Sequence, residues 1–415
     1  TITDTLHVRG GQGLNDSASH DREHTGPGTV AGRYLRTFWH PVYRAQDLAP
    51  GEAQQVTIMN ERFTLYRGES GIAHVVAPVC AHRQTQLSIG WVEDDCIRCF
   101  YHGWKYDGSG QCVEQPGEDA SFKDRVRIRT YPTREYLGLV FAYLGEGEAP
   151  EFPRYTDFEV EGVLEACIPE YWPCNYFNRI DNGCDGAHVR WTHREAIMRA
   201  GSGFRLSMPD EVVSEETECG IRHLSMNGGK LSDEYHYFHM PNVSQAAAYT
   251  RVEGSLEDAK TLRGDRISWR LPVDDENTVS FSVDLIYLTG EAADAYRERR
   301  RGTEELAMKE FPPPELGNQI LAGRLREKDI DRRLSTATLF SVEDYVAQVG
   351  QRHPDRSRDR LGRMDGAVAM LRGIWERELR ALDDGRPLKR WTPPSGTTKT
   401  VQAKSSVIPS GARNP

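Results

Sequence analysis

Two short motifs in the first quarter of the chain each combine a cysteine with a histidine. Cys80 precedes His82 by two residues, and Cys99 precedes His102 by three. Both pairs lie in predicted loops between short strands, so their side chains can meet at one metal centre. Two thiolates and two imidazoles suit a [2Fe-2S] cluster with the cysteines on one iron and the histidines on the other. Because neutral imidazole replaces anionic thiolate, such a cluster has a reduction potential of roughly −150 to +300 mV.

A zinc site with two cysteines and two histidines is the alternative interpretation of these motifs. Zinc ligands usually come as a cysteine pair and a histidine pair, whereas each motif here mixes the two residue types. Cys96 and Cys99 do form a C-x-x-C pair, but on a strand their side chains point to opposite faces. Gly103 and Trp104 fit a tight loop in which backbone amides approach the sulfurs and an indole shields them. The pattern therefore predicts the iron–sulfur cluster.

A second pair of histidines lies further along the chain. His188 and His193 are five residues apart, which is too far round a regular helix for both to share one face. A break or bulge between them would let both imidazoles converge. With one carboxylate from a distant part of the chain, they would form the facial triad that binds non-haem Fe(II) and leaves positions open for O₂. His236 and His239 are rival histidines, which we interpret as strand residues that could line a pocket.

Several stretches of the sequence carry a family resemblance. Residues 80–111, with Gly90 between the two motifs, resemble the Rieske domain of ring-hydroxylating oxygenase α subunits. Residues 341–351, in which a Glu-Asp pair is followed by a glutamine, resemble the phthalate-dioxygenase branch of that family. The run of residues 91–102 and the Gly-Pro-Gly at 26–28 most resemble members of this branch that demethylate lignin-derived biphenyls.

This resemblance implies further site residues. Asp344 aligns with the family's carboxylate ligand of the iron, and Glu343 is the alternative. Asp185, three residues before His188, matches an aspartate that accepts hydrogen bonds from a cluster histidine of one subunit and an iron histidine of its neighbour. Carboxylates that orient histidine ligands are a common device in metal sites. Asn182 matches a polar residue that the family often has near the iron.

The resemblance also implies a function. It describes a terminal oxygenase that oxidises an aromatic acid with O₂, by demethylating an aryl methyl ether and releasing formaldehyde, or alternatively by ring cis-dihydroxylation or hydroxylation. The sequence has no dinucleotide-binding G-x-G-x-x-G after a predicted strand, so electrons from NAD(P)H are expected to arrive through a separate reductase, with or without a ferredoxin. Transfer from cluster to iron across a subunit contact implies a homotrimer or a stacked hexamer.

Two alternative interpretations, both without oxygenase activity, are also compatible with the sequence. An electron-transfer protein with a Rieske cluster would contain only the cluster's iron and would leave His188, His193 and Asp344 idle. A zinc-stabilised binding module would be colourless, whereas a [2Fe-2S] protein is brown. Arg199, Arg205 and Arg251 are candidates by position only for binding an aromatic acid, because most arginines are solvated surface charges. Aromatic residues such as Tyr235, Tyr237 and Phe238 are more often core than pocket walls.

The composition narrows the class of protein and its partners. The 415 residues leave room for two domains, and eight cysteines are too few for a disulfide-stapled secreted fold. The sequence shows neither a signal peptide nor a run of apolar residues that could span a bilayer, so a cytoplasmic location is expected. The net charge of −10 argues against nucleic acid and anionic membranes as partners, and it would suit a basic protein partner.

The elements that must position these residues predict an α+β fold. It combines a small antiparallel β Rieske domain with a larger catalytic domain, in which helices flank an antiparallel sheet in a helix-grip-like arrangement. Strands are expected at 55–59, 63–66, 73–76, 96–100, 111–114, 125–131, 138–144, 163–169, 211–224, 233–240, 246–252, 267–271 and 279–288, and helices at 31–38, 173–193, 292–301, 342–350 and 365–382. The predicted division is a leader and helix at 1–41, the Rieske domain at 42–150, the catalytic domain at 151–391 and an extended or disordered arm at 392–415.

Overall fold

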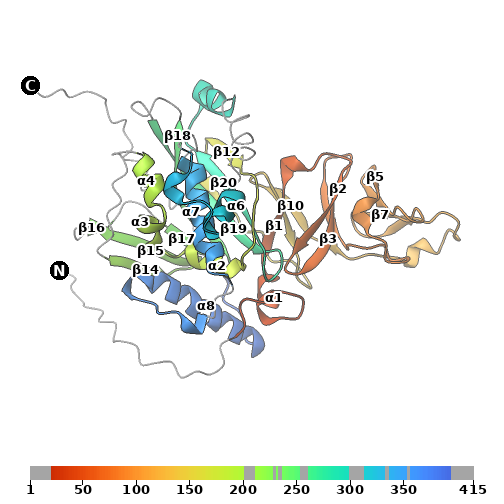
Figure 1. The fold of residues 1–415 in the computed structure, drawn as a ribbon. Helices are drawn as coiled ribbons and strands as arrows, with labels where there is room; N and C mark the ends of the chain where they lie inside the picture. Colours follow the sequence, from red (N-terminus) through yellow and green to blue (C-terminus); the bar gives the residue numbers. More distant parts are fainter. Residues whose placement is uncertain are drawn as a thin grey trace, which may run out of the picture.

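The computed structural model has a projecting β lobe and a larger lobe built from a sheet and helices (Figure 1). This is the predicted α+β class with the two predicted kinds of domain. The structure describes residues 20–200, 211–227, 230–231, 236–252, 260–298, 313–331, 336–352 and 356–393. Most of the predicted leader and arm, together with Arg205 and Tyr235, lies outside these residues. Within them, no helix combines the length and the apolar character needed to cross a bilayer.

The β lobe consists of three small antiparallel sheets. The base sheet has the order β1 (Trp39–Arg44), β11 (Leu139–Tyr143), β10 (Thr133–Tyr136). The middle sheet has the order β2 (Ala53–Ile58), β3 (Glu61–Arg67), β4 (Ala73–Val76), β9 (Thr130–Tyr131). The outer sheet has the order β5 (Trp91–Glu93), β6 (Cys96–Arg98), β7 (Lys105–Asp107), β8 (Cys112–Glu114).

The larger lobe is organised around one antiparallel sheet of nine strands. Its main order is β12 (Val163–Ala166), β20 (Thr278–Ile286), β19 (Lys260–Pro272), β18 (Val243–Val252), β17 (His236–His239), β15 (Gly220–Asn227), β14 (Glu211–Glu216), with β13 (Glu170–Trp172) paired to β20 and β16 (Lys230–Leu231) to β15. The helices are α1 (Val30–Leu35), α2 (Tyr176–Asn182), α3 (His188–Thr192), α4 (Arg194–Ala200), a helix over residues 290–298, α6 (Pro313–Leu321), α7 (Thr336–Gly350) and α8 (Gly366–Asp383).

The two lobes share one hydrophobic core. The rings of Phe141 on β11 and Trp269 on β19 meet edge to face with their centroids 5.4 Å apart. The turn between β2 and β3 is also bound to the large sheet, because the amide of Met59 donates to the carbonyl of Pro272 at 2.8 Å. The base of the β lobe is therefore held in a defined position on the nine-stranded sheet. The predicted boundaries at residues 42 and 150 stay predictions.

Alternation along β20 explains which sheet face lies in this core. Val279, Phe281 and Val283 point into it and are fully buried. The residues between them are polar and turn to the opposite face, where α2 contacts β19 and β20. Successive side chains of a strand point to opposite faces, so a strand in which apolar and polar residues alternate has one apolar face and one polar face. The polar face is the one that lies towards the helices of the catalytic site.

Three predicted elements differ from the observed ones. The single strand expected at 211–224 is wrong: the chain turns at Cys219 and forms β14 and β15, and the amide of Thr217 donates to the carbonyl of Gly220 at 2.8 Å. The strand expected at 125–131 is reduced to β9, since residue 127 makes only an isolated bridge with Gln111. The continuous helix expected at 173–193 is broken between α2 and α3. Strands β1, β5, β7, β10, β13 and β16 and helices α4 and α6 were not predicted.

Candidate metal centres

The two Cys-His motifs form loops with the same backbone geometry. The amide of Cys80 donates to the carbonyl of Thr85 at 2.8 Å, and the amide of Gln84 donates back to Cys80 at 3.1 Å. The loop at Cys99 repeats both hydrogen bonds at the same spacing, with lengths of 2.8 and 3.1 Å. The fifth residue of each loop, Gln84 or Gly103, has a positive φ, of 59° and 72° respectively. The sequence therefore builds two equivalent loops that face each other.

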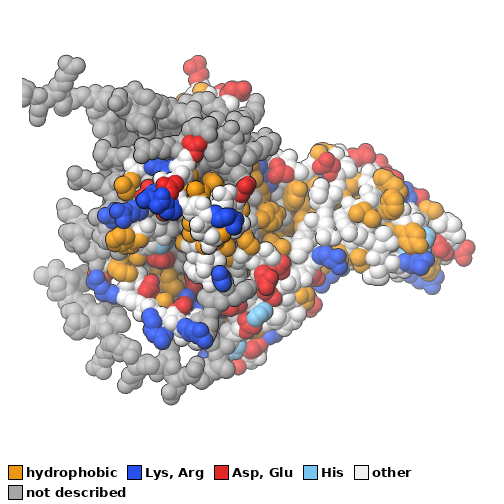
Figure 2. All heavy atoms as spheres, viewed as in Figure 1, with side chains coloured by type: hydrophobic (Ala, Val, Ile, Leu, Met, Phe, Trp, Pro, Cys, Tyr) orange, Lys and Arg blue, Asp and Glu red, His pale blue; other side chains and the backbone are white. Residues whose placement is uncertain are grey.

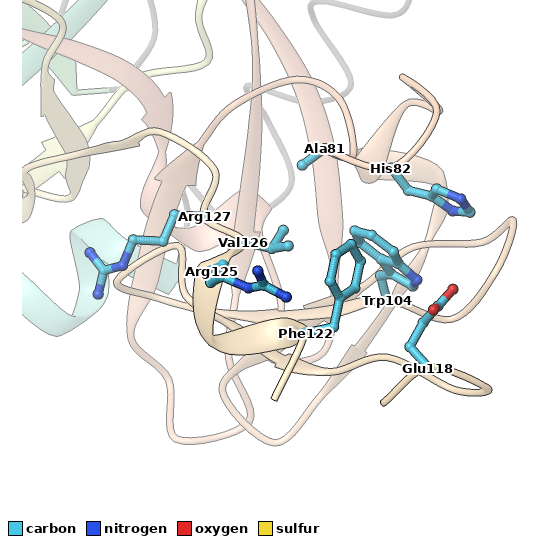
Figure 3. A pocket seen from close by; sticks show the side chains of 8 residues that line it. All are labelled: Ala81, His82, Trp104, Glu118, Phe122, Arg125, Val126 and Arg127. Carbon is cyan, nitrogen blue, oxygen red and sulfur yellow. The ribbon is translucent and has the colours of Figure 1, made fainter. Parts of the chain in front are cut away.

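These loops place the four predicted cluster ligands in two layers. Cys80 and Cys99 are buried, with exposed fractions of 1% and 2%. His82 and His102 lie at the rim, with ring centroids 4.5 Å apart. The rings of Trp104 and His82 stack with nearly parallel planes and centroids 4.5 Å apart, and shielding of the sulfurs by Trp104 stays a prediction. The two cysteines are therefore buried in the lobe, while His82 and His102 are partly exposed. Figure 3 shows His82 beside Trp104 at the pocket that both residues line.

The donor set fits a [2Fe-2S] cluster. Nδ1 of His82 is buried without a hydrogen-bond partner among the described residues, which is costly unless a ligand occupies that position. The sulfur of Cys80 lies 3.5 Å from the amide of His82 and 3.1 Å from the hydroxyl of Tyr106. Burial raises the pKa of the Cys80 thiol despite these contacts, so metal binding would be needed to hold it as a thiolate. Cys96 instead lies beside Lys105 and acidic groups.

The second site depends on a break in the helix. His188 is the first residue of α3, and His193 follows its last residue. Helix α4 then starts at Arg194, and the amide of Ile197 donates to the carbonyl of His193 at 2.9 Å. The two imidazole centroids lie 5.4 Å apart. The predicted break is thus present and brings both rings together.

Helix α7 brings a carboxylate to these two histidines. Oδ1 of Asp344 lies 3.7 Å from Nε2 of His188 and 3.6 Å from Nε2 of His193. One ligand atom from each of the three residues lies within 4.8 Å of the others. Two imidazoles and one carboxylate on one side of a centre are the donor set that suits non-haem Fe(II).

Hydrogen bonds at the other ring nitrogens decide which atoms can bind a metal. Nδ1 of His188 donates to the backbone carbonyl of Asp185, and Nδ1 of His193 donates to Oε2 of Glu343 at 3.0 Å. A neutral imidazole with its proton on Nδ1 has its lone pair on Nε2, and both Nε2 atoms face Asp344. Burial lowers the pKa of His193, against the opposing effect of Asp344, which favours the neutral ring.

Glu343, the alternative ligand in the sequence prediction, has a different place. It is 4% exposed and accepts hydrogen bonds from His193 and from the amide of Ala196 at 2.9 Å. Burial raises its pKa to about 7, and Asp344 acts in the same direction. Asp344 is positioned in turn by Gln348, whose amide donates to Oδ1 at 3.1 Å. Glu343 therefore orients one histidine, while Asp344 faces both.

Asp185 and Asn182 lie near the candidate iron ligands, but neither is one of the three ligand residues. Oδ1 of Asp185 accepts from the amides of Ala187 at 2.9 Å and His188 at 3.2 Å, and so caps the start of α3. Oδ2 lies 3.9 Å from Nδ1 of His188, and the side chain is 29% exposed. Asn182 is the last residue of α2 and accepts from the amide of Asp185 through its backbone carbonyl. The bridging role of Asp185 and the role of Asn182 stay predictions.

Two histidines and one arginine singled out in the sequence, His236, His239 and Arg199, are not among the three candidate iron ligands. His239 is buried and bonded to Gln245 at 2.9 Å, which gives it a structural role on the core face. His236 lies opposite His223, with ring centroids 5.0 Å apart. His223 is buried, burial lowers its pKa to about 3, and the neighbouring His236 acts in the same direction. Nothing in the sequence singles out His223, because a lone histidine in a strand is usually a core residue. Arg199 donates to the carbonyls of Ile330 and Asp331 and holds that loop.

We predict that His188→Ala removes the mononuclear iron and leaves the cluster intact. Iron analysis should fall from about three to about two atoms per chain, with the visible absorption of the cluster unchanged. Glu343→Gln is the matched variant, because it keeps the three ligands but weakens the acceptor for His193. Its iron affinity should fall by roughly 10–100-fold. Loss of the cluster together with the iron in His188→Ala would show a folding defect instead.

Comparison with known proteins agrees with this architecture. Residues 38–132 match the family described as Rieske [2Fe-2S] domain. The chain is 28% identical over 372 residues to the 5,5'-dehydrodivanillate O-demethylase oxygenase subunit of Sphingobium sp., covering 88% of this chain and 80% of that one. It is 27% identical to the phenoxybenzoate dioxygenase subunit alpha of Ectopseudomonas oleovorans, covering 86% and 84% of the two chains.

Solved structures show the same fold at lower identity. The chain is similar to NdmA of Pseudomonas putida CBB5, with a TM-score of 0.59 and 18% identity over 88% of this chain and 94% of that one. It is equally similar to the terminal oxygenase of carbazole 1,9a-dioxygenase from Nocardioides aromaticivorans IC177, with a TM-score of 0.59 and 20% identity over 84% and 97%. The predicted resemblance is thereby confirmed: residues 38–132 match a Rieske [2Fe-2S] domain, and most of the chain is similar to oxygenase subunits of the Rieske non-haem iron type.

Proposed function

We propose that this oxygenase demethylates an aryl methyl ether of an aromatic acid, such as a lignin-derived biphenyl or a methoxybenzoate. The observation that carries the proposal is the similarity to a demethylase subunit over 88% of the chain. That similarity includes both motif regions and α7. The group of His188, His193 and Asp344 supports the proposal, since it offers three ligands on one side and leaves positions for O₂ and substrate.

The reaction consumes one O₂ and two electrons for each methyl group. Cys80, His82, Cys99 and His102 would hold the cluster that delivers electrons, and His188, His193 and Asp344 would hold the iron that activates O₂. One oxygen atom enters the methoxy carbon and the other leaves as water. The resulting hemiacetal collapses to a phenol and formaldehyde. NAD(P)H supplies the electron pair through a separate reductase.

Ring cis-dihydroxylation or hydroxylation is the second candidate. The observation that favours it is the similarity to a phenoxybenzoate dioxygenase subunit, which is as extensive as the similarity to the demethylase. The same three metal ligands would serve either reaction.

The turnover assay separates these two candidates. With NADH and a surrogate reductase, we expect methoxylated biphenyl or benzoic acids to yield formaldehyde and a new phenol in equal amounts. The measurements are formaldehyde by a colorimetric assay and the phenol by chromatography. A cis-diol or a hydroxylated ring without formaldehyde would contradict demethylation and support the second candidate.

A groove beside His82 supports electron delivery by a separate protein. It has a volume of about 510 Å³ and is lined by Ala81, His82, Trp104, Glu118, Phe122, Arg125, Val126 and Arg127 (Figure 3). Aromatic rings run from the cluster ligand to the surface, because Trp104 stacks on His82 and meets Phe122 edge to face at 5.9 Å. Within the described residues, neither Arg125 nor Arg127 has a carboxylate partner. Two such cations at the rim fit an acidic electron carrier, although the whole chain is acidic.

We predict that reversing these charges weakens docking of the donor. Arg125→Glu combined with Arg127→Glu should raise the KM for an acidic ferredoxin or reductase by roughly tenfold or more at low salt, because rim charges steer association. Steady-state kinetics with varied donor concentration measure the effect. Arg154→Glu, at an exposed site on another surface, is the control. Equal KM values in both variants would mean that the donor docks elsewhere.

Assembly into a homotrimer or a stacked hexamer would join a cluster to the iron site of a neighbour. In one chain, the outer sheet of the β lobe and helix α3 lie at opposite ends of the molecule (Figure 1). Both ends expose apolar side chains: Trp91, Phe100 and Tyr101 near the cluster, and Trp191 and Met198 beside the iron site. Figure 2 shows apolar side chains on the projecting lobe. Different surfaces that meet head to tail can close into a ring.

We predict that Asp185→Asn slows transfer from cluster to iron. Asparagine still caps α3, so both metals should be retained, but the bridging anion is lost. Reoxidation of the reduced cluster in single-turnover stopped-flow measurements should slow by roughly 10–100-fold. Asp294→Asn, a substitution at an exposed helical site, should leave the rate unchanged. Normal reoxidation in Asp185→Asn would show that the bridging role is wrong.

A further inference from the structure

The polar face of the central strands forms a floor beneath the helices that hold the candidate iron ligands. Ser244, Ser268 and Ser282 are paired across β18, β19 and β20, and cross-strand partners share a face. The next row on that face is formed by Arg270, Ser280 and Glu170. Ser268 and Ser280 are buried, each 2% exposed, whereas Arg266 on the same face is 51% exposed although its strand lies between two others.

Among the described residues, two of the three arginines at this face are paired directly with a carboxylate, and the third, Arg270, is not. Arg266 binds Asp284 with two hydrogen bonds of 2.6 and 2.7 Å. Arg179, which reaches down from α2, pairs with Glu170 at 3.2 Å. Arg270 faces the cations Arg179 and Arg266 as well as the carboxylates of Glu170 and Asp344. Within the described residues, its guanidinium makes no hydrogen bond to a carboxylate.

Buried polar atoms without hydrogen bonds gather at this place. Among the described residues, Nη1 of Arg270, Nε and Nη1 of Arg179 and Oγ of Ser280 have no partner. Arg179 is 4% exposed, and its guanidinium lies over the ring of Trp172 at 3.3 Å, which fixes its plane. Each unsatisfied buried group is costly, and charged groups more so. All but the hydroxyl are donors only, so the missing partner is rich in acceptor atoms.

This group of donors lies close to the candidate iron site. Ser341 on α7 donates to Oε1 of Glu170 at 2.9 Å. Asp344 follows Ser341 by three residues, which is a rise of about 4.5 Å along the helix. A ligand held by Arg270 and Arg179 would therefore have its other end within reach of the iron ligands.

We propose that Arg270 and Arg179, with Ser280, bind the carboxylate of the substrate. The inference rests on the proposed oxidation of an aromatic acid and adds the residues that recognise the acid. A carboxylate has about four acceptor positions, and a guanidinium can bind it through two parallel hydrogen bonds. The carboxylate is held at the row of Arg270 and Ser280, and the ring extends from there towards the candidate iron ligands.

Binding of simple aromatic acids to the holoenzyme tests this without turnover. Calorimetry with 4-methoxybenzoate and with the neutral 4-methoxybenzamide measures the contribution of the charge. Arg270→Gln should weaken binding of the acid by roughly 10–100-fold and binding of the amide by less than about threefold, because a hydrogen bond between charged groups is lost. Arg270→Lys should restore part of the affinity. Arg154→Gln, which removes an exposed cation, should change neither affinity.

The outcomes separate this inference from the proposed reaction. Acid binding that depends on Arg270 supports the carboxylate site, even if the wild-type enzyme releases no formaldehyde. Unchanged acid affinity in Arg270→Gln, at normal iron content, would mean that ordered water satisfies these donors and would overturn the inference, even if formaldehyde is released. A wild-type enzyme that binds neither compound would overturn it as well. If Arg270→Gln fails to fold, Arg270→Lys and Arg179→Lys supply the comparison through the ratio of acid to amide affinity.

Discussion

Two hydrogen bonds at imidazole Nδ1 atoms are the interactions on which the candidate iron site depends. A neutral imidazole has one proton and one lone pair, so an acceptor at Nδ1 turns the lone pair on Nε2 towards the centre. His188 has the backbone carbonyl of Asp185 as its acceptor, and His193 has Glu343. Each acceptor requires its own backbone arrangement. The first needs the turn between α2 and α3, and the second needs α7 packed against α4.

Helix geometry explains why the adjacent residues Glu343 and Asp344 on α7 have different roles. Successive residues of a helix differ in direction by about 100°, so Glu343 and Asp344 cannot face the same atom. Glu343 points into the contact with α4, where it is buried and bonded. Asp344 is half-buried and faces both Nε2 atoms. A carboxylate that is partly exposed can exchange its bound water for a metal ion more readily than a carboxylate buried in the core.

Much of the site could be predicted from the sequence because it depends on local spacing. The Cys-His motifs define their own loops, and the interval between His188 and His193 demands a break in any helix. Residues 279–288 showed the alternation of β20 directly. Predictions failed where tertiary pairing decides structure. The turn at Cys219 lies inside a stretch with uniform strand propensity, and short strands such as β13 exist only because β20 is next to them.

The residues around Arg270 were hidden from the sequence for a related reason. Arginines are common surface residues, and the strand pattern of β19 shows only that Arg270 and Trp269 point to opposite faces. Its significance appears when α2 adds Arg179 above the same sheet face and α7 adds Ser341 beside Glu170. Arg179 and Ser341 each lie more than 70 positions from Arg270 in the sequence, one before it and one after it. The sequence alone offered Arg199, Arg205 and Arg251 by position only, and of these Arg199 holds a loop.

The same arrangement bears on why related chains can carry out different oxidations. A carboxylate anchored near Arg270 would fix one end of an aromatic acid, while the metal ligands fix the point of attack. The atom that is oxidised then depends on the distance between these two points and on the length of the substrate. If a methoxy carbon lies at that distance, demethylation follows, and if a ring edge lies there, ring oxidation follows. The triad alone does not distinguish these cases, so the separation between Arg270 and the triad would decide between them.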